Sequence, residues 1–92
     1  MSLAYKKLKN KGYVIKSGLK FGGEFRVYEK KSFIKNKHAK YICIPIKQTE
    51  KIEPKDIISN IRVTHSTGKK LLLGIIDSQE DVTFYEIDWV KI

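Results

Sequence analysis

Hydrophobic residues follow two kinds of spacing along this chain, and each kind predicts a different secondary structure. Apolar residues one helical turn apart predict amphipathic helices over residues 4–11 and 54–65. Alternating positions and short apolar runs predict strands over residues 13–15, 25–28, 41–46, 71–76, 82–87 and 88–92. Strands and helices therefore intermix along the chain, which predicts an α/β fold.

Glycine and proline residues mark where these elements begin and end. Gly12 and Gly68 are expected to end the two helices, and Pro54 takes the first helical position, where its missing N–H costs nothing. The run 71–76 is apolar on both faces, which predicts a central strand. Pro45 cannot donate a ladder hydrogen bond, so strand 41–46 should end or lie at an edge there.

Polar segments connect the predicted elements. Residues 17–23 form a glycine-containing loop, but no Gly-Lys-Ser/Thr ending opens a helix there, so it is not a phosphate-binding P-loop. Residues 30–37 are a basic connector that brings His38 to the next strand, and residues 77–81 are an acidic hairpin turn. The buried stripe of helix 54–65 is expected to hold Ile57, Ile58 and Ile61.

Length and composition indicate one ordinary globular domain over residues 1–92, in which residues 1–3 are interpreted as an expression-vector remnant. Hydrophobic residues make up 41% and charged residues 32%, and no apolar run is long enough for a membrane-spanning helix. Cys43 is the one cysteine, so neither an internal disulfide nor a cysteine-based zinc site can form. This use of cysteine fits an intracellular protein whose buried thiol is inert.

The positive charge lies in the first half of the chain. The net charge is +9, but residues 1–40 carry +10 while residues 41–92 carry −1. A basic surface attracts nucleic acid by neutralising phosphates and releasing counterions. The charge therefore favours a nucleic-acid-binding protein. The alternative is a protein-interaction module whose lysines are merely solvated.

Three side chains on separate segments suggest acid–base cleavage of a phosphodiester without a metal or cofactor. Such cleavage of RNA needs a base for the ribose 2′-OH, an acid for the departing 5′-oxygen and a cation for the phosphate. Tyr28, His38 and Lys69 fit these roles respectively. Strand alternation places Arg26 on the same face as Tyr28, and nearby cations would lower the pKa of a tyrosine that serves as a base.

Several motifs give the chain a resemblance to a known family. These are residues 12–22, the segment Phe25-Arg26-Val27-Tyr28, His38, and the run 62–66 followed by Lys69-Lys70. Together they resemble the C-terminal catalytic domain of the tRNA-splicing endonucleases, and the resemblance extends over nearly the whole chain. It implies a small mixed β-sheet flanked by two or three helices.

The resemblance also implies a function and site residues. It implies cleavage of precursor tRNA with bulged splice sites at intron–exon junctions, which leaves a 2′,3′-cyclic phosphate and a 5′-hydroxyl. Tyr28, His38 and Lys69 match the family's catalytic positions. Arg62 resembles one arm of a cation–π clamp on a bulged base, and Trp89 is the candidate for the other arm. Further candidates for RNA contact are Arg26, Lys70 and Lys20.

Assembly follows from the same resemblance. It implies a homodimer through a C-terminal strand that carries Val90 and Ile92. It also implies that the acidic residues Asp77, Glu80 and Asp81 contact a basic surface of an opposing subunit, for which a second endonuclease subunit is the candidate. The chain departs from the family in having Thr67-Gly68 before Lys69 and in lacking the usual N-terminal domain. The alternative within the family is a non-catalytic RNA-binding or structural subunit. The expected location is the cytoplasm in an archaeon or the nucleus in a eukaryote.

Overall fold

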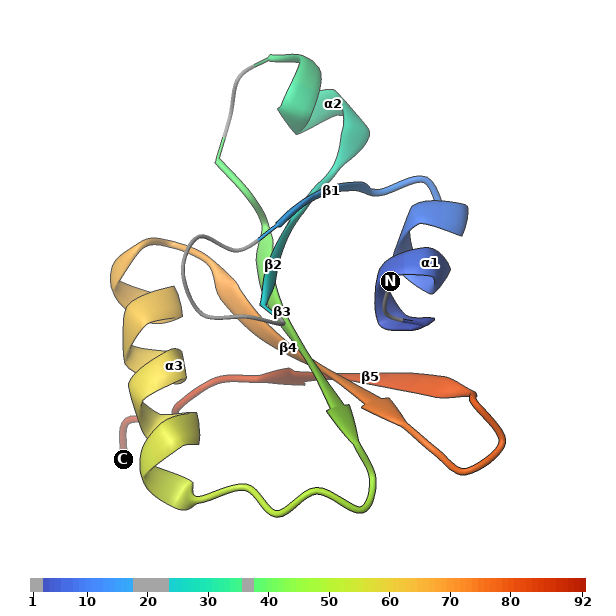
Figure 1. Cartoon of the computed structure of the whole chain (residues 1–92). Coiled ribbons are helices and arrows are strands. Elements are labelled where there is room, and N and C mark those ends of the chain that lie inside the picture. The colour runs from blue at the N-terminus through green and yellow to red at the C-terminus, as the bar shows by residue number, and fades with distance from the viewer. Residues whose placement is uncertain (1–2, 18–23, 36–37) are drawn as a thin grey trace.

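Five strands form one mixed β-sheet with helices on both faces in the part of the chain that the structure describes (Figure 1). This computed structural model describes residues 3–17, 24–35 and 38–92. In sheet order, the strands are β1 (Val14–Ser17), β2 (Phe25–Tyr28), β3 (Tyr41–Lys47), β4 (Lys70–Ile76) and β5 (Val82–Ile87). The predicted α/β fold and small mixed sheet are therefore confirmed.

The strand directions follow from the connections. β2 runs antiparallel to both of its neighbours, β1 and β3, and β4 and β5 form an antiparallel hairpin. β3 and β4 are parallel, which requires a crossover connection, and helix α3 (Pro54–Ser66) supplies it. Since β3 and β4 start at the same end of the sheet, the segments that precede them meet there.

The sheet buries apolar side chains on both faces, so the fold has two hydrophobic clusters. Helix α1 (Leu3–Asn10) covers one face through Ala4 and Leu8, which pack against Val27, Cys43 and Leu72. The other face packs against α3, and its buried members are Ile46, Leu71 and Leu73. Full burial of one aliphatic side chain contributes roughly 1.5–3 kcal/mol, so these two clusters fix both helices on the sheet.

The residues predicted to begin and end the helices are confirmed. Gly12 follows α1 with φ of 96°, and Gly68 follows α3 with φ of 71°, a conformation that glycine adopts without strain. Pro54 begins α3 as expected. No helix among the described residues is both long enough and apolar enough to span a membrane.

The two predictions for the inner strands are also confirmed. β4 lies between β3 and β5, and residues 71–74 are buried. Pro45 stands opposite Gly74 of β4, whereas the pairing of β3 with β2 ends at Cys43. Among the described residues, β3 is thus an edge on that side when it reaches Pro45, which suits a residue without an N–H.

Three sequence predictions are wrong. Residues 30–34 form a short helix, α2 (Lys30–Ile34), where a connector was expected, because this turn brings the Phe33 ring edge-on to Tyr28 at 5.4 Å between centroids. Residues 88–92 form no strand, since no other described segment pairs with them. Ile58 is 49% exposed, because Ile57 and Ile61, one turn apart, already fill the face of α3 toward the sheet.

Candidate functional site

Tyr28, His38 and Lys69 line one hollow of about 300 Å³ at one end of the sheet. Tyr28 ends β2, His38 precedes β3, and Lys69 precedes β4. Their neighbours around the hollow are Arg26, Ala39, Ile42, Val63 and Thr67. The structure therefore brings together the three residues that the sequence predicted to act together.

The sheet register explains why three distant segments meet. β2 runs antiparallel to β3 with Val27 opposite Tyr41, and β3 runs parallel to β4 with Tyr41 opposite Lys70. The end of β2 and the starts of β3 and β4 must then lie at the same end of the sheet. Two backbone hydrogen bonds hold these segments together there, from Lys40 N to Val27 O at 2.9 Å and from Lys70 N to Lys40 O at 3.0 Å.

The end of α3 places Lys69 in the hollow. Its backbone N–H donates to the carbonyl of Thr64 at 2.7 Å, which closes the helix and turns the chain toward β4. Lys69 is half-buried, whereas His38 is exposed at the mouth of the site. Tyr28 is half-buried, with Phe33 packed against its ring. The site thus holds a phenol and an ammonium group in its wall and an imidazole that solvent can reach.

Arg26 adds a second cation to this hollow, and one nitrogen of its guanidinium group has no hydrogen-bond partner. Its Nε is buried and has no hydrogen-bond partner, and no carboxylate among the described residues forms an ion pair with it. Buried donors are nearly always paired, because leaving one unpaired costs about 1–3 kcal/mol. An anion that entered the hollow would supply the missing acceptor.

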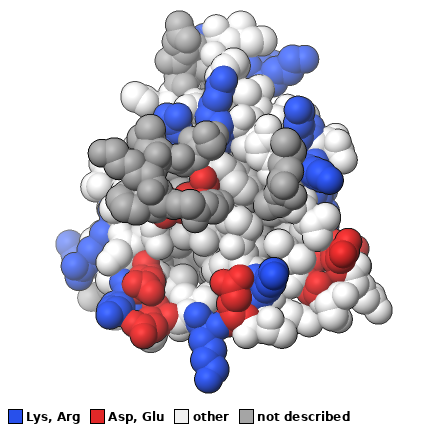
Figure 2. Space-filling model, viewed as in Figure 1, with Lys and Arg blue, Asp and Glu red and all other residues white. Residues whose placement is uncertain are grey.

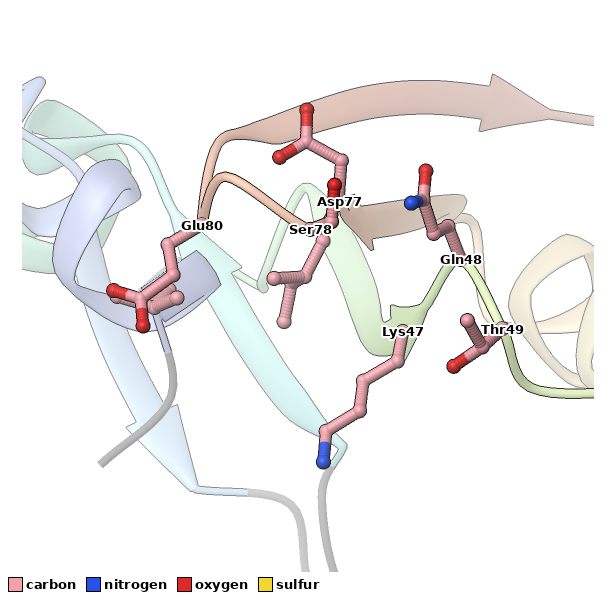
Figure 3. A pocket seen from close by; sticks show the side chains of 8 residues that line it. Lys47, Gln48, Thr49, Asp77, Ser78 and Glu80 are labelled. Carbon is pink, nitrogen blue, oxygen red and sulfur yellow. The ribbon is translucent and has the colours of Figure 1, made fainter.

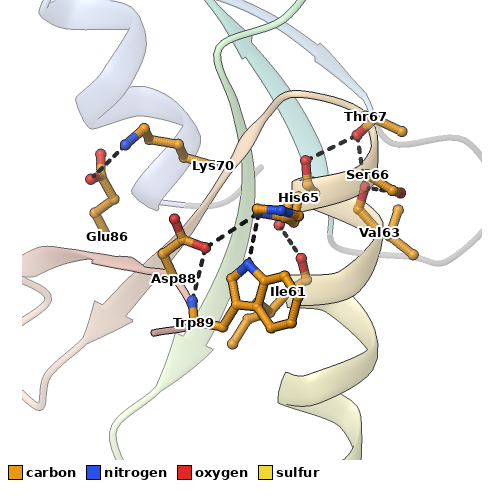
Figure 4. Close-up of polar contacts among 10 residues, drawn as sticks. Ile61, Val63, His65, Ser66, Thr67, Lys70, Glu86, Asp88 and Trp89 are labelled. Carbon is orange, nitrogen blue, oxygen red and sulfur yellow. Dashed lines mark hydrogen bonds and ion pairs between the residues drawn. The ribbon is translucent and has the colours of Figure 1, made fainter. Parts of the chain in front are cut away.

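Arg62 and Trp89 line a second hollow of about 220 Å³, together with Ile58 and Ile61. The structure therefore brings together the two predicted arms of a base clamp. Trp89 is 56% exposed, and its indole N–H donates a hydrogen bond to His65 (Figure 4). The sequence did not predict this contact between α3 and the C-terminal segment.

The other predicted RNA contacts are placed differently. The Lys70 ammonium group pairs with the Glu86 carboxylate at 3.5 Å, so RNA would compete with that carboxylate (Figure 4). Lys20 lies outside the described residues. Lys40, beside the site, pairs with Glu29 at 3.2 Å, and this hydrogen-bonded carboxylate raises the pKa of the Lys40 ammonium group.

The acidic hairpin turn lines a third hollow, of about 270 Å³, with residues that follow β3 and with Leu3 of α1 (Figure 3). Asp77 stabilises the turn itself, because its carboxylate accepts the backbone N–H groups of Gln79 and Asp81. Glu80 sits at the rim with φ of 64°, and Asp81 is exposed. Among the predicted interface acids, it is therefore the Asp77 side chain that stabilises the turn, which leaves the carboxylates of Glu80 and Asp81 for a contact with another molecule.

Acidic and basic side chains are unevenly spread on the surface. In Figure 2, acidic side chains lie mainly in the lower half of the face shown, which in the same view of Figure 1 holds the segment before α3 and the β4–β5 hairpin.

At the C-terminus, Val90 is 80% exposed and Ile92 is fully exposed.

Cys43 is buried, and this burial raises the pKa of its thiol to about 12, as expected of an inert core cysteine.

No three His, Cys, Asp or Glu side chains within the described ranges are grouped so that they could share a metal ion. The candidate site is instead built from a phenol, an imidazole and two cationic side chains. These groups can exchange protons and stabilise negative charge, and acid–base cleavage of a phosphodiester requires both functions.

Comparison with known proteins gives the lineage. Residues 1–84 match the family model described as tRNA intron endonuclease, catalytic C-terminal domain. The chain belongs to this family. The tRNA-splicing endonuclease of Methanothermobacter thermautotrophicus is 39% identical to it over 89 residues, which are 97% of this chain and 52% of that protein. The tRNA-splicing endonucleases of Pyrococcus abyssi and Methanococcus maripaludis are 38% and 37% identical, and this chain covers 50% of each.

This tRNA intron endonuclease domain thus spans about half the length of the curated relatives it matches. The sequence predicted four of the eight residues that line the hollow of Tyr28, but not two contacts that shape the candidate sites. The ring contact of Phe33 with Tyr28 depends on the unforeseen helix α2. The His65–Trp89 hydrogen bond joins residues 24 positions apart, and the side-chain types alone were the available signal.

Proposed function

We propose that this chain is the catalytic domain of an RNA endonuclease that cleaves precursor tRNA at intron–exon junctions. The observation that carries the proposal is the hollow shared by Tyr28, His38 and Lys69. The family of the chain and the names of its relatives supply the substrate class. The basic first forty residues, with a net charge of +10, suit a polyanionic substrate.

The proposed reaction is an internal transfer at phosphorus. Tyr28, as the base, takes the proton of the ribose 2′-OH while the 2′-oxygen forms a bond to phosphorus. The bond from phosphorus to the 5′-oxygen breaks, and His38 donates a proton to that leaving oxygen. Lys69 stabilises the negative charge on the phosphate oxygens. The products are a 2′,3′-cyclic phosphate and a 5′-hydroxyl, and no metal takes part.

Arg26 is assigned to the same phosphate. Its buried Nε lacks an acceptor in the described structure, and a phosphate oxygen would provide one. Tyr28 lines the same hollow, so Arg26 would bind the phosphate beside the proposed base.

Substrate selection is assigned to the second hollow. A bulged base that is unstacked from its helix can lie between the guanidinium of Arg62 and the indole of Trp89, by cation–π and stacking contacts. A paired base cannot reach this position. Arg62→Ala is thus expected to weaken binding of bulged RNA more than binding of fully paired RNA, while equal losses would make Arg62 an ordinary phosphate contact.

The proposed assembly is a homodimer through the C-terminal segment. Val90 and Ile92 expose apolar side chains that a second copy could cover by strand pairing. Val90→Asp combined with Ile92→Asp should convert a dimer to a monomer in sedimentation, whereas Glu80→Lys combined with Asp81→Lys should not. The acidic residues are assigned to a further contact with a second endonuclease subunit. A monomeric wild type at high micromolar concentration would contradict the interface.

Cleavage of a bulge-containing precursor tRNA in excess EDTA tests the proposed function. Wild type should cut at the junctions and leave cyclic phosphate ends. His38→Ala and Tyr28→Phe should each lower the rate by about 100-fold or more, because one proton-transfer group contributes roughly that much. Lys69→Ala should have an effect on the order of 100-fold as well, because it removes a donor that stabilises charge in the transition state. Lys40→Ala is the matched control, since it removes a neighbouring cation that does not line the hollow. Binding without cleavage would indicate the non-catalytic subunit, and a need for added metal would refute the mechanism.

A further inference from the structure

The one tryptophan of the chain is held by a histidine side chain. The Nε1–H of Trp89 donates to Nδ1 of His65 at 2.8 Å. The two rings also meet edge to face, with centroids 4.7 Å apart and an angle of 76° between their planes. Figure 4 shows the indole beside α3 with its nitrogen directed at the imidazole. One hydrogen bond and one ring contact thus restrict the rotation of an otherwise exposed side chain.

This contact lies beside the hollow that Arg62 and Trp89 share. Arg62 and His65 are three residues apart on α3, so their side chains emerge from neighbouring positions of the same helix surface. Ile58 and Ile61 complete the lining. Because the nitrogen edge of the indole is fixed on His65, the direction of its aromatic face relative to Arg62 is fixed as well.

Asp88 fixes the backbone where His65 fixes the ring. Its carboxylate accepts the backbone N–H of Trp89 at 2.8 Å. The same carboxylate oxygen lies 3.9 Å from His65 Nδ1, which is too long for a hydrogen bond. Since Nδ1 accepts from the indole, it carries no proton, and the imidazole proton is on Nε2. The acceptor role of this nitrogen is therefore the property that a substitution must remove.

We propose that His65 is a positioning residue of the RNA site, which holds Trp89 in the orientation that receives an extruded base opposite Arg62. This inference rests on the proposed function of the second hollow. A free indole would lose rotamer freedom when RNA binds, whereas the indole held by His65 is already oriented. Loss of the hydrogen bond should therefore weaken binding of bulged RNA by about five-fold, the equivalent of one ordinary hydrogen bond.

The first arm of the test needs no RNA. Because Trp89 is the only tryptophan, its indole N–H gives a single side-chain resonance in a ¹⁵N-correlated NMR spectrum. His65→Phe keeps an aromatic ring but removes the acceptor, and should speed exchange of this proton with water by about five-fold. His65→Asn retains a short acceptor and should restore slow exchange in part. An unchanged exchange rate in His65→Phe would overturn the proposal directly.

The second arm measures binding of a hairpin RNA with a bulged nucleotide and of the same hairpin with that nucleotide paired. His65→Phe should weaken the first and spare the second, and His65→Asn should recover part of the loss. In a Trp89→Ala background, His65→Phe should have no further effect, because a positioning residue acts through the residue it positions. An additional loss in that background would assign His65 a direct RNA contact and overturn the positioning role.

The two arms separate the failure of this inference from that of the proposed function. If Trp89→Ala leaves bulged-RNA binding unchanged, the base clamp is wrong, and the role of His65 falls with it. If Trp89→Ala weakens binding but His65→Phe does not, the clamp stands and the positioning role is refuted. Loss of binding by both variants, confined to the bulged hairpin and partly rescued by His65→Asn, supports the inference.

Discussion

Arg26→Met should make the protein more stable and less active at the same time. The guanidinium has a buried Nε without an acceptor, which costs about 1–3 kcal/mol in the free protein. Methionine has a similar unbranched stem and no donor, so it can fill the same space. With part of the gain lost to imperfect packing, we expect stabilisation by about 1 kcal/mol, which raises the Tm of a domain this size by roughly 4–8 °C.

Thermal unfolding followed by circular dichroism measures the stability, and cleavage of precursor tRNA measures the activity. Arg26→Lys is the matched control, because it keeps a cation in the hollow that Tyr28, His38 and Lys69 line. The lysine variant should retain more activity than the methionine variant, and inorganic phosphate should stabilise wild type but not Arg26→Met. If Arg26→Met lowers the Tm, or if it cleaves at the wild-type rate, the assignment of this side chain to an incoming phosphate is refuted.

Further predictions concern the packing that supports the site. Gly74→Ala should destabilise the protein by about 1–3 kcal/mol in urea unfolding, because the added Cβ would lie 3.1 Å from a Phe84 ring carbon and 3.2 Å from Ala4 Cβ. Gly68→Ala should cost roughly 1–2 kcal/mol from its φ of 71° alone, since nothing lies within 4 Å of the new Cβ; equal stability of this variant and wild type would contradict the assigned backbone. Cys43 should resist alkylation at pH 8 until the protein unfolds, because burial raises its pKa to about 12, and rapid labelling of native protein would contradict that burial.

Local signals were sufficient to predict most of the fold. The alternation of Phe25 and Val27, which are buried, with Arg26 and Tyr28 identified both faces of β2. The two-sided apolar run of β4 identified a central strand. Proline and glycine positions located the ends of α3, because they act through the backbone of the residue itself. Each of these signals is contained in a short stretch of sequence, which is why it can be read without the tertiary structure.

The features that were missed depend on contacts between distant segments. Helix α2 is a single turn of weakly predictive sequence that packs Phe33 on Tyr28. Residues 88–92 have strand-like alternation, but a strand also needs a partner to pair with. Trp89 was foreseen as a base-stacking residue, whereas its hydrogen bond to His65 joins the C-terminal segment to α3 and has no local pattern. Side-chain orientation at the site therefore had to come from the structure.

The proton-donating role of His38 can be tested at the leaving atom itself. His38→Ala should lose most of its cleavage rate on an ordinary bulged precursor RNA, because the departing 5′-oxygen then has no acid to protonate it. Sulfur in place of that oxygen at the scissile bond leaves readily without a proton. We predict that this substitution restores much of the rate of His38→Ala while the defect of Lys69→Ala remains. If His38→Ala is equally defective on both RNAs, His38 is not the acid, and the proposed mechanism at this hollow is contradicted.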